Sequence, residues 1–580
     1  MQIERVFTWF LGLALGATLA GTAAARERVV QPEQTTAIAE RTSVTAREFM
    51  VASAHPLATE AGHAVLAAGG SAADAAVAVQ TMLNLVEPQS SGLGGGGFLL
   101  YWNAALGELT SFDARERAPL AADESYWLRE DGTPVDFQDA VIGGRSVGVP
   151  GTPLLLETVH ARYGRMPWAE LIAPAIARAE EGFPVSQRLA DAIAEARDLD
   201  RFAEARAYFF EEDGSPKAEG TILRNPDLAR TLRLFGAHGA APFYTGSIAR
   251  DIVAAVRTET NTGILTPLDL ATYKVIERAP VCVQYRRHDV CGMGPPSSGG
   301  LTVGQILGML EAFDLAALGP GTRSAHLFLE ASRLAFADRA LYIADSDFVA
   351  MPGGLLDRDY LASRAQLINP KAAMGEAAAG TPPWDDALRL SPDRPRPRQG
   401  TTHFVIVDRD GDMVSATMTI EAGFGSRVMT GGFLLNNELT DFALEPKTDG
   451  APVANRVEGG KRPRSSMAPT VVLRDGAPVL LTGSPGDANI IPYTAASIIA
   501  IVGWGMDPQE AIDLPHVVNR NGPTGVEEGP TADTTAAALE ALGHEVVIEN
   551  LNSGLHVIRI GPDGLTGAAD KRREGTVLGD

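Results

Sequence analysis

The chain has 580 residues and a formal net charge of -23, from 49 Lys and Arg against 72 Asp and Glu. This negative charge argues against nucleic acid or an anionic membrane surface as a partner. With 45% hydrophobic residues, the chain has enough apolar side chains to bury a large core, which excludes a disordered polymer.

Residues 1–25 are typical of a signal peptide. The apolar run at 7–19 is shorter than a membrane span, and Ala23, Ala24 and Ala25 form the small-residue pattern that signal peptidase cleaves. We therefore expect export to the periplasm or the exterior, with cleavage after Ala25. No other apolar run reaches about 18 residues, so we expect no membrane partner after signal cleavage.

The next elements are helical. A helix is expected at 59–68, and Ser71 with Asp74 then forms a capping box for a buried helix running to about Val86. The glycine-rich run at 92–97 matches G-x-G-x-x-G, but a dinucleotide site needs a strand before it and a helix after it. Here the order is reversed, so we exclude a nucleotide site and expect the glycines to allow close backbone approach.

A hairpin follows, and its second strand at 108–114 ends at Arg115. Residues 150–265 are mostly helical in pattern.

Cys282 and Cys291 lie in a later hairpin, where they form either a disulfide or two buried thiols. Further helices are expected at residues 297–313, 324–345, 493–503, 507–514 and 531–542.

A Pro-, Arg- and Asp-rich segment at 382–399 is typical of an exposed, unstructured approach to Thr401. Strands are expected at 404–408 and 413–420, joined by a turn. If the loop holds three residues, the ladder places Thr419 opposite Thr401.

Thr401 has the properties of a nucleophile that becomes a new N-terminus. A Thr hydroxyl needs a base, and an N-terminal Thr carries its own, an α-amino group with an ordinary pKa of about 8. The same hydroxyl can first attack the carbonyl of Gly400, form an ester and split the chain there. Glycine at position 400 offers little steric hindrance.

Nine motifs extend this interpretation to most of the chain. They are residues 54–58 (AHPLA), 74–79 (DAAVAV), 87–89 (EPQ) with 94–98 (GGGGF), 115–119 (RERAP), 295–300 (PPSSGG), 401–403 (TTH), 434–437 (LLNN), 464–467 (RSSM) and 482–486 (TGSPG). In this order, over roughly residues 45–575, they resemble the γ-glutamyltranspeptidase family of N-terminal nucleophile hydrolases.

The resemblance implies an α+β fold, the αββα four-layer sandwich, in which two sheets pack face to face between helices. It implies a proenzyme that cuts itself at Gly400-Thr401 into a large subunit, residues 26–400, and a small subunit, residues 401–580, which together form one sandwich. The implied activity is γ-glutamyl transfer from glutathione and other γ-glutamyl amides to water or to an amino acid or peptide acceptor, with no cofactor.

The resemblance also assigns roles around Thr401. Thr419 matches the second Thr that hydrogen-bonds the nucleophile, and the backbone N–H groups of Gly486 and Asp487 match the pair that binds the oxyanion. The family usually has Gly-Gly there. The Asp487 carboxylate is unfavourable near a developing oxyanion unless it turns away or is paired.

A glutamyl group carries an α-carboxylate and an α-ammonium, so its pocket needs both signs of charge. The resemblance assigns Arg115 to the carboxylate, with supporting hydroxyl donors and three acids for the ammonium. The hydroxyls are those of Ser465 and Ser466, and the acids are Glu421, Glu438 and Asp441. Many relatives carry amides at one or two of the acidic positions, and three acids together favour a proton on at least one of them.

Two alternatives remain open. One is a related acylase of the glutaryl-cephalosporin type, whose substrate lacks the ammonium. The other is an inactive, unprocessed homologue that binds amino acids. This alternative remains because the Asp487 carboxylate is unfavourable for catalysis. We expect no metal, because no His or Cys cluster has metal-ligand spacing, and we expect His403 to be a packing residue.

Overall fold

Two seven-stranded sheets, antiparallel throughout, pack face to face in the computed structural model, which describes residues 35, 39–384, 389–393 and 400–580. The first has the order β1 (Val44–Ala46), β22 (Gly564–Ala569), β21 (His556–Gly561), β17 (Ala477–Gly483), β16 (Thr470–Arg474), β9 (His288–Gly292), β8 (Val281–Tyr285). The second has the order β23 (Thr576–Gly579), β2 (Met50–Ser53), β10 (Thr401–Val407), β11 (Met413–Thr419), β3 (Gly96–Asn103), β4 (Glu108–Ala114), β7 (Ile276–Arg278).

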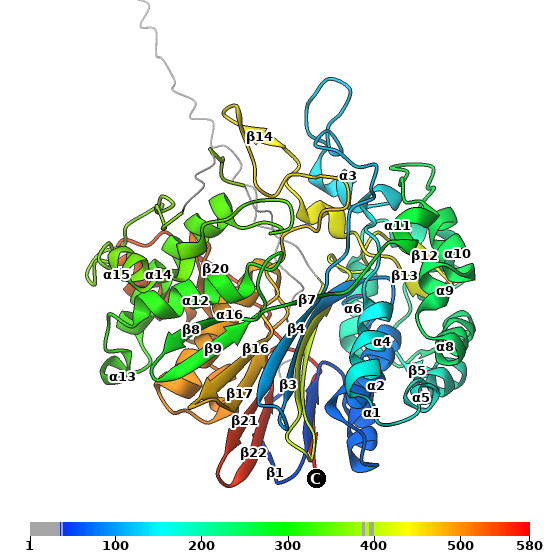
Figure 1. Cartoon of the computed structure of the whole chain (residues 1–580), viewed down its shortest axis with the longest axis horizontal. Helices are drawn as coiled ribbons and strands as arrows, with labels where there is room; N and C mark the ends of the chain where they lie inside the picture. The colour runs from blue at the N-terminus through cyan, green and yellow to red at the C-terminus, as the bar shows by residue number, and fades with distance from the viewer. Residues whose placement is uncertain (1–34, 36–38, 385–388, 394–399) are drawn as a thin grey trace, which may run out of the picture. The chain divides into compact units, whose positions relative to one another are not determined.

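Helices cover the outer face of each sheet (Figure 1). The helices α1 (Pro56–Ala67), α2 (Ala72–Val86) and α4 (Thr152–Tyr163) pack on the second sheet, and α5 (Trp168–Glu181) and α8 (Pro226–His238) lie outside them. The helices α12 (Gly299–Leu310) and α16 (Ile490–Ile498) pack on the first sheet, and α14 (Thr322–Tyr342) packs against α12. The predicted αββα sandwich is therefore confirmed.

Smaller elements complete the fold. The other helices are α3 (Phe137–Val141), α6 (Gln187–Glu195), α7 (Ala203–Phe209), α9 (Ala241–Tyr244), α10 (Ser247–Ala255), α11 (Pro267–Ala271), α13 (Leu315–Leu318), α15 (Arg358–Ala365), α17 (Pro508–Ile512) and α18 (Ala532–Glu540). A three-stranded sheet of β18 (Val517–Asn519), β19 (Thr524–Glu527) and β20 (Val546–Glu549) lies beside α14 and α18. No described helix has the length and apolarity that crossing a bilayer requires.

Strand alternation explains which way β10 presents its side chains. Phe404 and Ile406 join the core beneath the helices, whereas Val405 and Val407 lie between the two sheets with residues such as Leu481 of β17. Because side chains alternate along a strand, Thr401 shares the side of Val405 and Val407. The nucleophile proposed from the sequence therefore faces the gap between the sheets.

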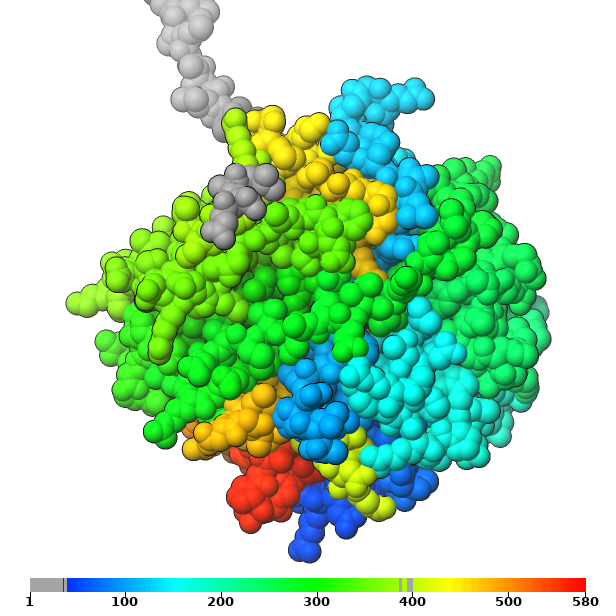
Figure 2. Space-filling model, viewed as in Figure 1, coloured from blue at the N-terminus to red at the C-terminus, as the bar shows by residue number. Residues whose placement is uncertain are grey.

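Both sheets mix strands from before and after residue 400. In the second sheet, β10 pairs with β2 on one side and β11 pairs with β3 on the other. The face shown in Figure 2 likewise combines residues before 400, in blue to green, with C-terminal residues in yellow, orange and red. A single backbone cut at residue 400 would leave all of these pairings in place.

The predicted hairpin register is confirmed, because Thr401 pairs with Thr419. The first strand begins at Thr401 rather than Phe404, since the ladder continues to that pair. The helix expected at 493–503 ends as α-helix at Ile498 and continues as a π-helical turn, Ile499–Gly503. Of the two alternatives for the cysteines, the structure has the disulfide Cys282–Cys291.

The glycine run and the approach segment also have definite structures. A Cβ on Gly95 would lie 1.9 Å from the carbonyl oxygen of Thr419, which confirms close backbone approach. The prediction of an unstructured approach is wrong for residues 389–393, because the Ser391 hydroxyl donates to Thr448 O (2.7 Å) and Arg464 Nη2 donates to the Asp393 carboxylate (2.6 Å). Residues 385–388 and 394–399, like residues 1–25, lie outside the described residues.

Candidate active site

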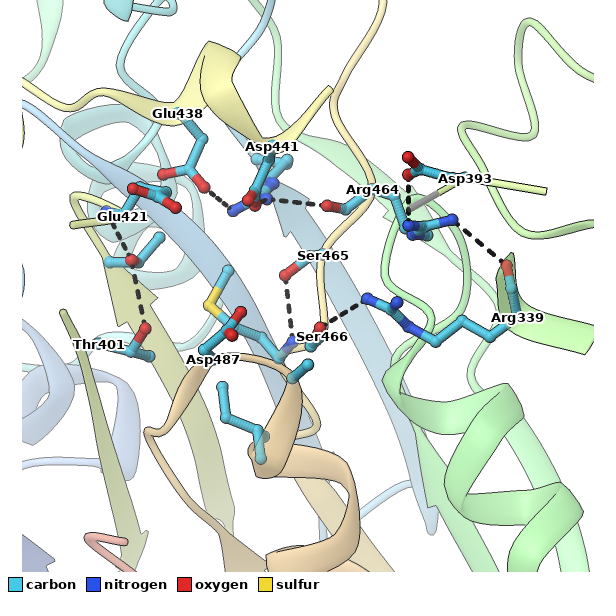
Figure 3. A pocket seen from close by; sticks show the side chains of 15 residues that line it. Arg339, Asp393, Thr401, Glu421, Glu438, Asp441, Arg464, Ser465, Ser466 and Asp487 are labelled. Atoms are coloured by element: carbon cyan, nitrogen blue, oxygen red, sulfur yellow. Dashed lines mark hydrogen bonds and ion pairs between the residues drawn. The ribbon is translucent and has the colours of Figure 1, made fainter. Parts of the chain in front are cut away.

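One cavity brings together most of the residues that the sequence analysis named (Figure 3). Its lining includes Arg115, Thr401, Thr419, Glu421, Glu438, Asp441, Ser465, Ser466 and Asp487, and also Arg339, Asp393, Arg464, Met467, Ala488 and Ile490. Gly400 and Gly486 do not line the cavity, but each directly precedes a residue that does.

Two Thr hydroxyls converge on the carbonyl that precedes the predicted cut. Thr401 Oγ1 lies 2.8 Å from Gly400 O, and Thr419 Oγ1 donates to the same oxygen at 2.7 Å. The two hydroxyl oxygens are 3.4 Å apart. A hydrogen bond to this carbonyl polarises it toward attack, so the Gly400-Thr401 bond has a nucleophile and an electrostatic activator beside it.

The loop after β11 orients the Thr419 hydroxyl. The backbone N–H of Glu421 donates to Thr419 Oγ1 at 2.8 Å, which leaves the hydroxyl proton to point at Gly400 O. Glu421 has a φ of 76°, a left-handed conformation that is unfavourable for a non-glycine residue by about 1 kcal/mol or more. This strained turn therefore lies at the point where the Thr419 hydroxyl has to be held in position to donate to Gly400 O.

Glycine at position 400 is required by the backbone as well as by the chemistry. Its φ is 109°, and a Cβ there would lie 2.6 Å from Glu421 O. A side chain would therefore push Gly400 away from the turn that holds the Thr419 hydroxyl in place.

The turn after β17 presents Gly486 and Asp487 at the start of the segment leading into α16. Gly486 has a φ of 130° and Asp487 a φ of 53°, so both adopt conformations that favour glycine, and Asp is among the side chains that tolerate the second. The ring of Tyr493 packs on Gly486, where an added Cβ would meet it at 2.8 Å. The sequence analysis predicts these backbone N–H groups as oxyanion donors, and their place next to a helix N-terminus suits that role.

Arg115 is buried at the centre of a charged cluster. Its guanidinium contacts the carboxylates of Glu438 and Asp441, and Nε donates to Pro463 O at 3.1 Å. The resemblance assigns the guanidinium to the α-carboxylate and the acids to the α-ammonium of a substrate, but in the structure the guanidinium and two of the acids contact each other. The physical reason is that a buried guanidinium needs a counter-charge.

Glu116 lies next to Arg115 but does not line the cavity, and it was assigned no role from the sequence. It is fully buried, with Oε2 3.9 Å from Arg115 Nη1. Burial and the neighbouring Glu438 charge raise the Glu116 pKa well above its usual range, although Arg115 opposes the shift. The crowded acids therefore favour a proton on Glu116, which is not among the three acids considered from the sequence. Its position directly after Arg115 was the one feature of the sequence that could have indicated a place beside the guanidinium.

One further arginine and one backbone N–H group support the two predicted Ser residues. Arg339 Nη2 donates to Ser466 Oγ at 2.7 Å, and Met467 N donates to Ser465 Oγ at 3.1 Å. Both hydroxyls accept a bond and keep their protons, so each can donate to a ligand. Arg339 comes from α14, far from Ser466 in sequence, so no local pattern pointed to it.

His403 packs between the sheets. Its Nδ1 is 2.8 Å from Thr417 Oγ1, and its ring stacks near that of His556. Burial, followed by the His556 contribution, lowers the His403 pKa well below its usual range. A neutral, enclosed imidazole fits the predicted packing role.

In the described part of the chain, one group of potential metal ligands comes together: His326, Glu330 and His544. The spacing in the sequence did not reveal it, because His544 is distant from the other two. His326 Nδ1 and His544 Nε2 are 2.8 Å apart, and Glu330 Oε2 accepts from Met374 N at 2.8 Å. These contacts favour a hydrogen-bonded network, and the absence of a metal stays a prediction.

Comparison with known proteins decides the family. The family model described as Gamma-glutamyltranspeptidase matches residues 58–580. The chain belongs to the γ-glutamyltranspeptidase family. It is 37% identical to a glutathione hydrolase proenzyme of Bacillus subtilis over 547 residues, covering 92% of each chain.

Acylases of this family are similarly close. The chain is 36% identical to an Acylase ACY 1 proenzyme of Pseudomonas sp. over 552 residues, covering 93% of this chain and 94% of the relative. The crystal structure of a cephalosporin acylase from Bacillus halodurans superposes with a TM-score of 0.81 at 28% identity, covering 93% of this chain and 97% of that one. Family membership and the N-terminal nucleophile hydrolase fold are thus shown, but overall similarity does not separate the two substrate classes.

Proposed function

We propose that this protein is a γ-glutamyltransferase and glutathione hydrolase, made as a proenzyme that cuts its own chain between Gly400 and Thr401. The observation that carries the proposal is the convergence of the Thr401 and Thr419 hydroxyls on Gly400 O, inside a cavity lined by Arg115 and acids. Attack by Thr401 Oγ1 on the Gly400 carbonyl breaks the C–N bond and forms an ester. This acyl shift frees the α-amino group of Thr401, and hydrolysis of the ester then releases the Gly400 carboxylate and restores the Thr401 hydroxyl.

The mature Thr401 then acts on substrate. Its amine takes the hydroxyl proton, Oγ1 attacks the γ-carbonyl, and the oxyanion is held by the backbone N–H groups of Gly486 and Asp487. The amine returns the proton to the leaving group, which departs. Water or an acceptor amine releases the γ-glutamyl group from the ester, and Thr419 keeps the nucleophile oriented.

Substrate binding uses an exchange of ion pairs. The α-carboxylate of the glutamyl group replaces the carboxylates of Glu438 and Asp441 at Arg115. The α-ammonium of the same group then pairs with these released carboxylates and with Glu421. Ser465 and Ser466 donate to the substrate carboxylate. The exchange gives each charge of the substrate an oppositely charged partner, which offsets the cost of burying it.

The precursor is expected to be exported and its signal peptide removed after Ala25, giving a large subunit, residues 26–400, and a small subunit, residues 401–580. The interleaved strands keep these subunits together after the cut. N-terminal sequencing of the two chains of protein recovered from outside the cytoplasm checks both cleavage points.

Thr419→Val is expected to slow self-cleavage by about 100-fold, because it removes a hydrogen bond to the carbonyl under attack, and one oxyanion donor contributes about 3 kcal/mol. The Thr419→Ser variant keeps the hydroxyl and should be cut at close to the normal rate. The measurement is the intact fraction on a denaturing gel against time after purification. Equal rates for the Val and Ser variants would contradict this role of Thr419.

The substrate class is tested with a matched pair of anilides. γ-Glutamyl and glutaryl anilides differ in the α-ammonium, and the acids in the cavity predict a preference for the γ-glutamyl compound of about 100-fold or more in kcat/KM, since buried acids left unpaired lose binding energy. A preference for the glutaryl compound would identify an acylase. Binding of glutamate to an uncut chain without turnover would identify the inactive homologue.

A further inference from the structure

Asp487 places a carboxylate where a developing negative charge has to be stabilised. Its side chain lies in the cavity with Thr401 and Ser466 (Figure 3), and its backbone is one of the two proposed oxyanion donors. A carboxylate there opposes the build-up of charge on the substrate oxygen.

Arg520 lies beside this carboxylate. Its Nη1 is 3.5 Å from Asp487 Oδ2, and both side chains are largely shielded from solvent, with exposures of 25% and 11%. Shielding weakens the screening of the pair by water, so the charge of Arg520 acts on Asp487 more strongly than an exposed arginine would.

The turn that carries Arg520 is held on both sides. Asn519 Oδ1 accepts from Asn521 N at 2.8 Å, and Asn521 exchanges two hydrogen bonds with the backbone of Ala377, at 2.7 and 2.8 Å. Arg333 Nη1 donates to Gly522 O at 2.8 Å. The arginine therefore extends from a fixed point rather than from a loose surface loop.

We propose that Arg520 is a positioning residue for the transferase reaction, which holds the Asp487 carboxylate at the side of the cavity and offsets its charge so that the neighbouring N–H groups can stabilise the oxyanion. The inference rests on the proposed function. It explains how the chain keeps a competent oxyanion site with an acid where its family usually has glycine.

The test is a double-mutant cycle between positions 487 and 520, measured as kcat for γ-glutamyl anilide hydrolysis by the self-cleaved protein. Arg520→Gln, which keeps the length and polarity of the side chain, is expected to lower kcat by about tenfold, within the range for contacting, coupled residues. In an Asp487→Asn background the same change is expected to alter kcat by less than about twofold. Asparagine suits the comparison because it also tolerates left-handed backbone.

Three further variants separate electrostatics from folding. Arg520→Lys restores the charge and should recover most of the lost kcat. Glu549 is another acid influenced by Arg520, so Glu549→Gln should leave the dependence on Arg520 in place. If Arg520→Gln does not fold or cut itself, Arg520→Ala in both backgrounds gives the same comparison.

The outcomes are distinct. An equal loss of kcat in the native and the Asp487→Asn backgrounds, or no loss in either, overturns the inference while leaving the proposed function intact. Absence of turnover in the unmodified, self-cleaved protein overturns the proposed function itself.

Discussion

Thr401→Val is expected to leave the protein as one uncut chain without γ-glutamyl activity, whereas Thr402→Val is cut and active. The two residues are neighbours in sequence but lie on opposite faces of β10. Thr401 Oγ1 contacts Gly400 O, whereas the buried Thr402 Oγ1 has no hydrogen-bond partner among the described residues. Removing an unpartnered buried hydroxyl costs little, but removing the nucleophile abolishes both cleavage and catalysis.

The measurement combines a denaturing gel, mass spectrometry of the fragments and γ-glutamyl anilide hydrolysis. The loss for Thr401→Val should be on the order of 10⁴-fold or more, as for other lost nucleophiles. Thr401→Ser keeps a hydroxyl and should still be cut. A Thr401→Val protein that yields a fragment beginning at residue 401 would exclude Thr401 as the agent of cleavage.

The local part of the fold could be predicted from the sequence. Where a predicted boundary was wrong, the structure shows a physical reason. Alternation and loop length were enough for the Thr401 to Thr419 register. The first helix was predicted to begin at residue 59 but begins at Pro56, because His55 acts as its N-cap through Nδ1, which accepts from Leu57 N at 3.2 Å. Histidine is not among the preferred capping residues, so its role was not visible in the pattern.

The pairing of distant strands could not be derived in this way. The pairing of β2 with β10 and that of β1 with β22 join segments hundreds of residues apart. Periodicity reports which face of a strand is buried, but it does not name the strand's neighbours. The αββα arrangement was available only through the resemblance of ordered motifs to a family.

The residues of the candidate site likewise fall into those that the sequence could identify and those that it could not. Residues inside short motifs, such as Arg115 and Ser465, could be named in advance, and the structure brings them to one cavity with Thr401. Arg339 and Arg520 were missed because each reaches the site from an element distant in sequence, through side-chain contacts that no local pattern shows. The direct contact of Arg115 with the acids was also missed, because a sequence shows which side chains are charged but not the distances between them.

Arg115→Lys is expected to raise KM about 100-fold for both the γ-glutamyl and the glutaryl anilide. Lysine keeps the positive charge but loses the planar fork that binds a carboxylate through two hydrogen bonds, and both substrates present a carboxylate there. Loss of a buried charge-assisted contact costs about 2–5 kcal/mol, so an effect of this size is expected in binding. Asp441→Asn, in contrast, should raise KM only for the γ-glutamyl compound, because the acid is proposed to hold the ammonium.

Arg117 provides the matched control for Arg115. It belongs to the same short motif, but its guanidinium turns away and donates to Asp269 O at 2.7 Å. Arg117→Lys should therefore leave KM for both anilides unchanged, and thermal unfolding of all three variants shows whether a KM effect is secondary to instability. If Arg115→Lys and Arg117→Lys have equal effects on KM, or if Asp441→Asn weakens both anilides alike, the ion-pair exchange at Arg115 is not how the substrate is bound. Selective loss at Asp441, together with a shared loss at Arg115, would assign the two charges of the glutamyl group to opposite partners in one buried cluster.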